Sequence, residues 1–137
     1  MAVISITAAN VLASAQAIIN KAYNFGTTVT QGQPVYLDTN NFWQLANGIT
    51  SATTAAAKGV ALNAGAPSQP ATVVTYDPLF TPGGTLTVGV PVIVGSASGA
   101  LNPFTDVATG WYTTVVGVPI STSQMILNPL AGGVAHA

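Results

Sequence analysis

Few side chains in this chain could carry out acid–base or nucleophilic chemistry. The chain has 137 residues, and its single histidine, His136, is the penultimate one. The chain contains neither Cys nor Glu. A Ser-His-Asp triad would have to use that histidine, and chain ends are usually poorly ordered. The acids are Asp38, Asp77 and Asp106. Each stands beside turn residues, where Asp commonly caps the backbone rather than pairing for glycosidase chemistry. We expect no enzymatic activity and no cofactor.

Metal and phosphate sites also lack the usual residues. Ca²⁺ could use Asp38 with carbonyl oxygens of Asn40 and Asn41, but a single carboxylate is a weak basis for a calcium site. Gly83-Gly84 is not followed by the Lys-Ser/Thr pair of a phosphate-binding loop. We therefore predict no metal-ligating and no phosphate-binding residues.

The charge content limits the partners of this protein. Charged residues make up 4% of the chain, and the formal net charge is −1, whereas about a quarter of the residues in an ordinary domain are charged. Lys21 and Lys58 are too few and too distant to bind nucleic-acid phosphates or anionic lipid. The longest apolar run, 86–94, is far shorter than a membrane-spanning helix needs. The start of the chain lacks the basic segment of a secretory signal. We expect neither nucleic acid nor membrane as a partner.

A surface with so few charges must rely on hydroxyl and amide groups, or it must be covered by neighbouring molecules. About half of the residues are apolar, so one domain-sized core can be filled. This composition favours a protein that works within an assembly.

The strongest internal pattern is a repeat of two motifs. Thr30–Val35 and Thr87–Val92 share Thr-x-Gly-x-Pro-Val at an offset of 57 residues. Gly59–Leu62 and Gly117–Ile120 share Gly-Val-x-aliphatic at an offset of 58. Two copies of modest identity can match by chance, but we interpret them as two similar β units, at about 28–76 and 85–129.

The segments around these motifs are typical of short strands bounded by turn residues. The Ala-rich stretch 8–22 could form a helix, but its β-branched residues and lack of charge favour an extended arm followed by a strand. We predict a turn at 38–41, a helical turn or a loop at 51–57, and a connector between the units at 77–84. The predicted strands are 17–25, 35–37, 42–46, 58–63, 71–76, 92–94, 112–119 and 124–127.

The predicted fold is all-β: a small sandwich or barrel-like domain built from the two units, with an extended N-terminal arm. Its expected parts are the arm at 1–16, a single β domain at 17–130, and a flexible C-terminal tail at 131–137. The sequence alone leaves sandwich and barrel open.

Two adjacent aromatic pairs are candidate contact residues. In a strand, neighbouring side chains point to opposite faces, so one member of Phe42-Trp43 and one of Trp111-Tyr112 should leave the core. An outward aromatic on a neutral surface can anchor an interface. Core packing of these aromatics and a carbohydrate-binding platform are the alternatives.

The N-terminal arm supplies the other candidate contacts. Its apolar residues are Val3, Ile4, Ile6 and Val11. An extended, uncharged segment of this kind can add a strand to the exposed sheet edge of a partner. We therefore predict that these four residues belong to a protein–protein interface.

Three stretches together resemble a known family. Thr28–Asp38, Trp43–Ala46 and Ala57–Gly65 are similar to the head decoration, or capsid cement, proteins of tailed bacteriophages, and 86–94, 115–120 and 125–129 fit the same scheme. The resemblance implies a non-enzymatic protein on the outer surface of a virion, often a homotrimer, whose partner is the major capsid protein. Related patterns occur in phage fibre and spike proteins, so a module that binds a host receptor or glycan is the alternative.

Overall fold

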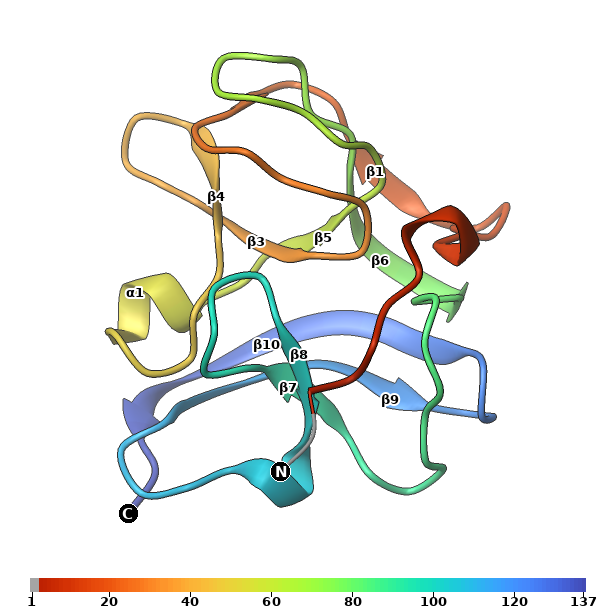
Figure 1. Cartoon of the computed structure of the whole chain (residues 1–137), viewed down its shortest axis with the longest axis vertical. Helices are drawn as coiled ribbons and strands as arrows, with labels where there is room; N and C mark the ends of the chain where they lie inside the picture. The colour runs from red at the N-terminus through yellow and green to blue at the C-terminus, as the bar shows by residue number, and fades with distance from the viewer. Residues whose placement is uncertain (1–2) are drawn as a thin grey trace.

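The structure, a computed structural model, describes residues 3–137 and is all-β, which confirms the predicted fold class. Within those residues the chain forms ten strands and three short helical pieces (Figure 1). The strands are β1 (Ile18–Asn20), β2 (Asn24–Phe25), β3 (Pro34–Leu37), β4 (Phe42–Leu45), β5 (Gly59–Ala61), β6 (Val73–Phe80), β7 (Val92–Val94), β8 (Leu101–Pro103), β9 (Tyr112–Pro119) and β10 (Met125–Ala135). The helical pieces are η1 (Ala8–Asn10), α1 (Ala52–Ala55) and η2 (Phe104–Asp106).

The strand order has the same sequence of elements on both sides of its centre. Hydrogen-bonded neighbours follow the order β2-β4-β3-β5-β6-β10-β9-β7-β8, and β1 also pairs with β6. Outward from the centre, β6-β5-β3-β4 therefore corresponds to β10-β9-β7-β8. We call residues 18–76 the N-terminal unit and residues 77–135 the C-terminal unit; they are the upper and lower parts of Figure 1. Strand β6 joins them, because Val73–Tyr76 pairs with β5 and β1 whereas Asp77–Phe80 pairs with β10.

The two units share strand register as well as strand order. Val35 pairs with Gly59 in the N-terminal unit, and Val92 pairs with Gly117 in the C-terminal unit. Further equivalent backbone bonds are Val29 N to Gly65 O with Leu86 N to Thr122 O, and Gln33 N to Thr30 O with Val90 N to Thr87 O. The sequence motifs therefore coincide with a repeat of backbone hydrogen bonding.

The glycine of each Gly-Val motif allows two strands to approach closely. A Cβ atom on Gly59 would lie 2.3 Å from the carbonyl oxygen of Val74 in β6. A Cβ atom on Gly117 would lie 2.7 Å from the carbonyl oxygen of Ile126 in β10. Any side chain at these positions would push the paired strands apart.

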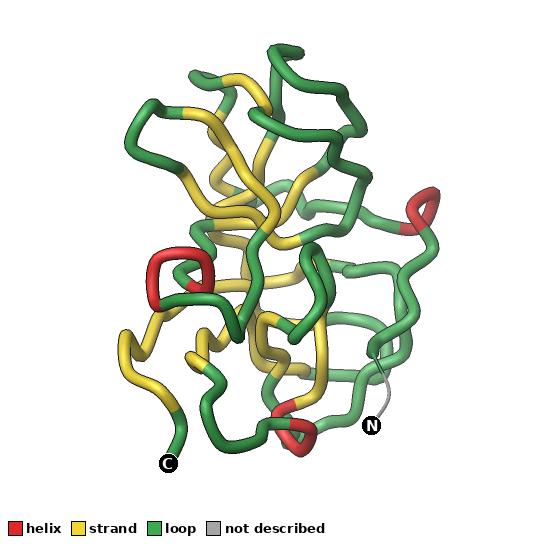
Figure 2. The backbone as a smooth tube through the Cα atoms, turned by 60° about the vertical axis from the view of Figure 1, so that its left-hand side comes forward, coloured by secondary structure: helices red, strands yellow, loops and turns green. Residues whose placement is uncertain are grey.

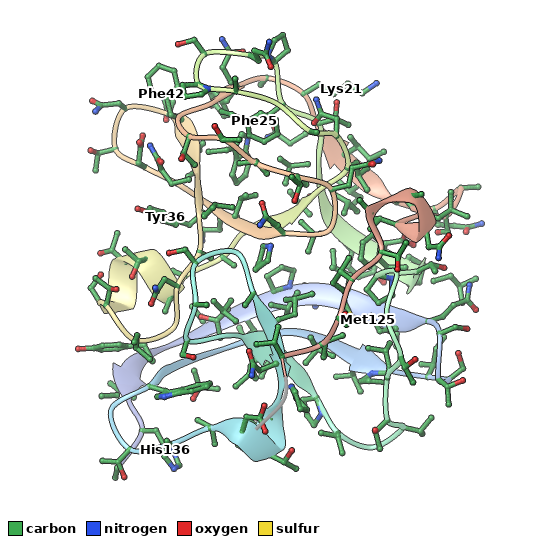
Figure 3. All side chains as sticks on the ribbon, in the orientation of Figure 1. Lys21, Phe25, Tyr36, Phe42, Met125 and His136 are labelled. Atoms are coloured by element: carbon green, nitrogen blue, oxygen red, sulfur yellow. The ribbon has the colours of Figure 1, made fainter. Side chains whose placement is uncertain are left out.

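Two cores lie on opposite faces of the β5–β6 pair. Because side chains alternate along a strand, the paired Val60 and Val74 face one core while the paired Ala61 and Val73 face the other. The first, the shared core, contains Val11, Ala46, Ala57, Val60, Val74, Phe80, Leu86, Val92, Val94, Leu101, Val116, Met125 and Leu127. The second, the N-terminal core, contains Phe25, Val29, Val35, Trp43, Ala61, Ala71 and Val73. Figure 3 labels Phe25 and Met125, one residue from each core.

The N-terminal unit is closed by its own strand β2. Phe25 of β2 lies beside Trp43 of β4 in parallel pairing. On the other side of β2, the N–H of Phe25 donates to the carbonyl of Gln69, and the N–H of Ser68 donates to the carbonyl of Phe25. Since residues 65–70 belong to the connection from β5 to β6, the hydrogen bonds form a ring around the N-terminal core.

The C-terminal unit is closed by a segment from outside it. The predicted arm covered residues 1–16; from here on, the arm means residues 3–14. These residues run between β8 and residues 81–84 and are the red N-terminal stretch in Figure 1. The backbone bonds of the arm to this unit are Ile4 N to Leu101 O, Thr7 N to Gly83 O, and two reciprocal bonds between Leu12 and Thr81. The arm thus lies beside β8 as β2 lies beside β4 in the other unit.

Three features differ from the sequence prediction. Residues 77–80, expected in a connector, continue β6; Pro78 is tolerated there because the pairing with β10 is irregular between Asp77 and Phe80. Residues 131–135, expected in a flexible tail, continue β10 through pairs with β9. Strand β8 was not predicted, since its segment has no alternating pattern. Figure 2 shows these strands in yellow.

The other secondary-structure differences are small. The arm is not extended throughout, because η1 interrupts it. Residues 51–57 contain the single helical turn that was one of the two predictions, and Ser51 caps it by accepting from the Thr54 N–H.

Candidate interaction surface

The outer face of the β9–β10 hairpin is apolar and exposed. Val118 pairs with Ile126 and Val115 pairs with Leu130 across the two strands. The side chains of Val118, Ile126 and Leu130 are 45%, 40% and 72% exposed. A surface groove of about 430 Å³ is lined by these four residues, Gly117 and Asn128. We call the four apolar residues the β9–β10 face; clustered exposed apolar side chains of this kind mark interaction sites.

The hairpin has this face because both sides of β10 are apolar. Met125 and Leu127 point into the shared core and are fully buried, and Ile126 between them points outward. The consecutive apolar run Met125-Ile126-Leu127 was the available signal in the sequence, since continuous apolar runs are typical of strands covered on both faces. The prediction of contact residues missed it, because it considered only aromatics and the arm.

Among residues 3–137, the Lys, Arg, Asp and Glu side chains that reach the surface belong to the N-terminal unit. Lys21 and Lys58 are exposed and Asp38 is half-buried, whereas Asp77 and Asp106 of the C-terminal unit are buried. Of residues 77–135, all of them described, none therefore exposes a Lys, Arg, Asp or Glu side chain. A partner docking on the β9–β10 face would have no charged group of this unit to desolvate.

The predicted arm contacts are mostly used within the chain itself. Val11 is 8% exposed and belongs to the shared core, and Ile4 and Ile6 are half-buried against that core. Only Val3 of the four keeps half of its surface exposed. In this conformation the arm completes its own domain, so Ile4, Ile6 and Val11 are not free for another protein.

The aromatic pairs divide between inside and outside unequally. Phe42 is 36% exposed while Trp43 is 2% exposed, so the outward member of that pair is the Phe. Figure 3 places Phe42 at the upper end of the molecule. In the second pair Trp111 is buried and Tyr112 is half-buried. The structure therefore does not bring the eight predicted contact residues together on one surface.

Asp38 has the turn role that the sequence predicted. Its Oδ1 accepts from the backbone N–H groups of Asn40 and Phe42, and its Oδ2 accepts from Gln44 Nε2 at 2.9 Å. The hydrogen bond from the Gln44 amide, followed by that from Phe42, holds the pKa of the Asp38 carboxyl below its ordinary value. This carboxylate organises the β3–β4 turn.

The other two acids are buried, and Asp77 also accepts from backbone N–H groups, as predicted for an Asp beside turn residues. Asp77 is buried in β6 and accepts from the Ser14 N–H at 2.7 Å, the Ser14 hydroxyl and the Leu79 N–H. Asp106 is buried in η2 and accepts from Asn102 Nδ2. Asp77 therefore fastens the C-terminal end of the arm to β6.

The described residues show no grouping typical of a metal site and no membrane-crossing helix. Among residues 3–137, no three His, Cys, Asp or Glu side chains lie close enough to hold one ion. No helix in the same range combines the length and the apolar character needed to cross a bilayer.

Comparisons with known proteins do not assign this chain to a family. No model of a known protein family matches it, and no curated protein matches it.

Proposed function

We propose that this protein is a structural virion component, a decoration or cement protein that binds the outer surface of a tailed-phage capsid and stabilises the shell without catalysis. The proposal rests on one observation, the neutral and apolar β9–β10 face, taken together with the sequence resemblance. Its partner is the major capsid protein, and its location is the outside of the assembled capsid.

The physical argument concerns what can cover this face. Burying apolar surface contributes roughly 25 cal/mol per Å², and Leu130, at 72% exposed, has most of its surface left to bury. The C-terminal unit exposes no Lys or Asp side chain, so attachment pays no desolvation of ionised groups there. A neutral, apolar area on the capsid exterior is therefore the matching partner surface.

One such face is small compared with a stable protein–protein interface, which buries roughly 800 Å² on each partner. Several copies that are held together attach more firmly, because each further contact forms at high effective concentration. We therefore propose that the protein acts as an oligomer, most simply a homotrimer, on the shell.

The proposal is tested by shell occupancy. Electron microscopy of the particle that carries this protein should show it on the outer capsid surface. The double variant Ile126→Ser/Leu130→Ser should raise the Kd for shells that lack the protein roughly thirtyfold, a loss of about 2 kcal/mol of apolar burial, and so lower occupancy at concentrations below saturation. Ile18→Ser is the matched control, since Ile18 is 60% exposed on β1 of the other unit. Equal occupancy for the two variants would remove the face from the proposal.

The salt dependence of shell occupancy is a second test of the proposal. Occupancy should change little between low and high NaCl, because the proposed contact contains few charges to screen. A steep loss of occupancy with salt would contradict a neutral interface. Binding of the isolated protein to a glycan array, without any binding to shells, would support the receptor-binding alternative instead.

A further inference from the structure

The groove that holds the arm is shaped for an extended chain. A Cβ atom on Gly83 would lie 2.7 Å from the carbonyl oxygen of Thr7, and one on Gly84 would lie 2.6 Å from that of Ser5. On the opposite side, a Cβ atom on Gly32 would lie 2.6 Å from the side chain of Ile6. At these three glycines the groove has no side chain, so it admits the backbone of the arm at close range.

The arm fills this groove incompletely. Two surface cavities of about 250 and 300 Å³ flank it, and both are lined by Val3 and Ile4. Among residues 3–12 only Val11 is buried, and the backbone bonds of this segment to the C-terminal unit are those of Ile4, Thr7 and Leu12. Segments with few buried contacts and few hydrogen bonds open at low free-energy cost.

The connection to the rest of the chain is also simple. Residues 13–17 contain one turn. Within it, Ser14 is held in place by hydrogen bonds to the carboxylate of the buried Asp77. The arm before this point carries no charge, so two arms from different copies do not repel each other. By contrast, β2 of the N-terminal unit is hydrogen-bonded to β4 along one side and to residues 68 and 69 along the other.

We propose that the arm groove is a strand-exchange site, in which residues 3–12 of one copy of this chain fill the groove of a second copy. After exchange, each arm makes with the second copy the same contacts that it makes within its own chain. The free-energy cost of exchange is therefore low once two copies lie side by side. Each copy then completes the shared core of its neighbour with Ile6 and Val11. The exchange requires only two copies of this chain, so it goes beyond the proposed function and does not depend on it.

Disulfide trapping tests the exchange in the full-length chain, which has no cysteine of its own. Leu12 and Thr81 form an antiparallel pair with both backbone bonds. The Cα atoms of such a pair are about 5.5 Å apart, within the range of a disulfide. Leu12→Cys and Thr81→Cys are made as separate variants with distinct mass tags, refolded together, and equilibrated in a glutathione redox buffer.

The expected product is a mixed disulfide between the two variants. Its yield should exceed, at least about tenfold, the yield from Leu12→Cys mixed with Val88→Cys, because only the arm groove provides a high effective concentration. Val88 is the matched control, being exposed and outside the described arm contacts. Equal yields from the two mixtures would overturn the exchange. Since no shell is present, this result is independent of whether the protein binds a capsid.

Discussion

The N-terminal and C-terminal units share strand order and register but differ in how they become complete. The N-terminal unit has a private core and is closed by its own β2. The C-terminal unit has no private core: its interior side chains join those of Val60 and Val74 from the other unit and Val11 from the arm. The same repeat therefore gives one self-contained unit and one that depends on its surroundings.

The surfaces of the two units also differ, in exposed charge and in exposed apolar side chains. The N-terminal unit carries the exposed Lys21 and Lys58, whereas the C-terminal unit exposes the apolar β9–β10 face. The N-terminal unit therefore carries the exposed charge, and the C-terminal unit carries this exposed apolar surface. The four predictions below test this difference between the units.

The largest expected effect concerns the two equivalent glycines. Gly59→Ala should lower the free energy of unfolding by about 3 kcal/mol and Gly117→Ala by about 1.5 kcal/mol, both through overpacking. The difference arises because Gly59 faces a backbone carbonyl at 2.3 Å, whereas the nearest atoms to Gly117, at 2.7 and 2.8 Å, include the flexible side chain of Met125. Urea unfolding measures both. If Gly117→Ala lowers the free energy of unfolding more than Gly59→Ala does, the C-terminal unit is the more tightly packed of the two around its glycine.

The next effect compares acids from the two units. Asp77→Ala should cost about 2 kcal/mol, because it leaves the partly buried donors of Ser14 and Leu79 without their acceptor. Asp38→Asn should cost less at neutral pH, since its turn is partly exposed. Thermal unfolding of the three proteins at neutral pH checks this order, and a larger cost at Asp38 would contradict it.

Asp38 also predicts a dependence on pH. Its pKa is lowered in the folded protein, so its ionised form stabilises the fold above the ordinary carboxyl pKa. That contribution is lost as the pH falls through the lowered, folded-state pKa. Wild type should therefore exceed Asp38→Asn in stability at neutral pH, and the gap should close in acid. A gap that stays constant would show that the stabilisation does not come from ionisation.

The smallest effect is expected inside the N-terminal core. Trp43 is 2% exposed, and its Nε1 has no hydrogen-bond partner. Trp43→Phe removes this unsatisfied donor while keeping an aromatic ring, so it should cost under about 1 kcal/mol. Circular dichroism during unfolding measures this cost, and a large loss for Trp43→Phe would show that the indole makes a contact that Phe cannot replace.

Much of the local structure could be predicted from residue patterns. Strands β3, β4, β7 and β9 lie where β-branched or aromatic runs between turn residues indicated them, and the turn at Asp38 follows from its side-chain hydrogen bonds. The continuation of β6 through Pro78 and of β10 to Ala135 could not be predicted. Both depend on pairing with strands distant in sequence, which overrides local propensity.

Most of the candidate contact surface could not be predicted from the sequence. Adjacent aromatics showed that one of each pair would face outward, but not that Phe42 rather than Trp43 would do so. Alternation along a strand sets which residues share a face, whereas the direction of that face depends on what packs against it. The β9–β10 face is exposed because the shared core takes the opposite side of the hairpin.

The order of amino acids by itself determined an all-β chain of two like units with very little charge, because periodicity, turn residues and composition act locally and can be read one segment at a time. Only the tertiary structure decided that the arm closes the C-terminal unit and that the apolar face lies on β9 and β10. Those outcomes depend on contacts between residues far apart in the chain, such as Ile4 with Leu101 and Leu12 with Thr81.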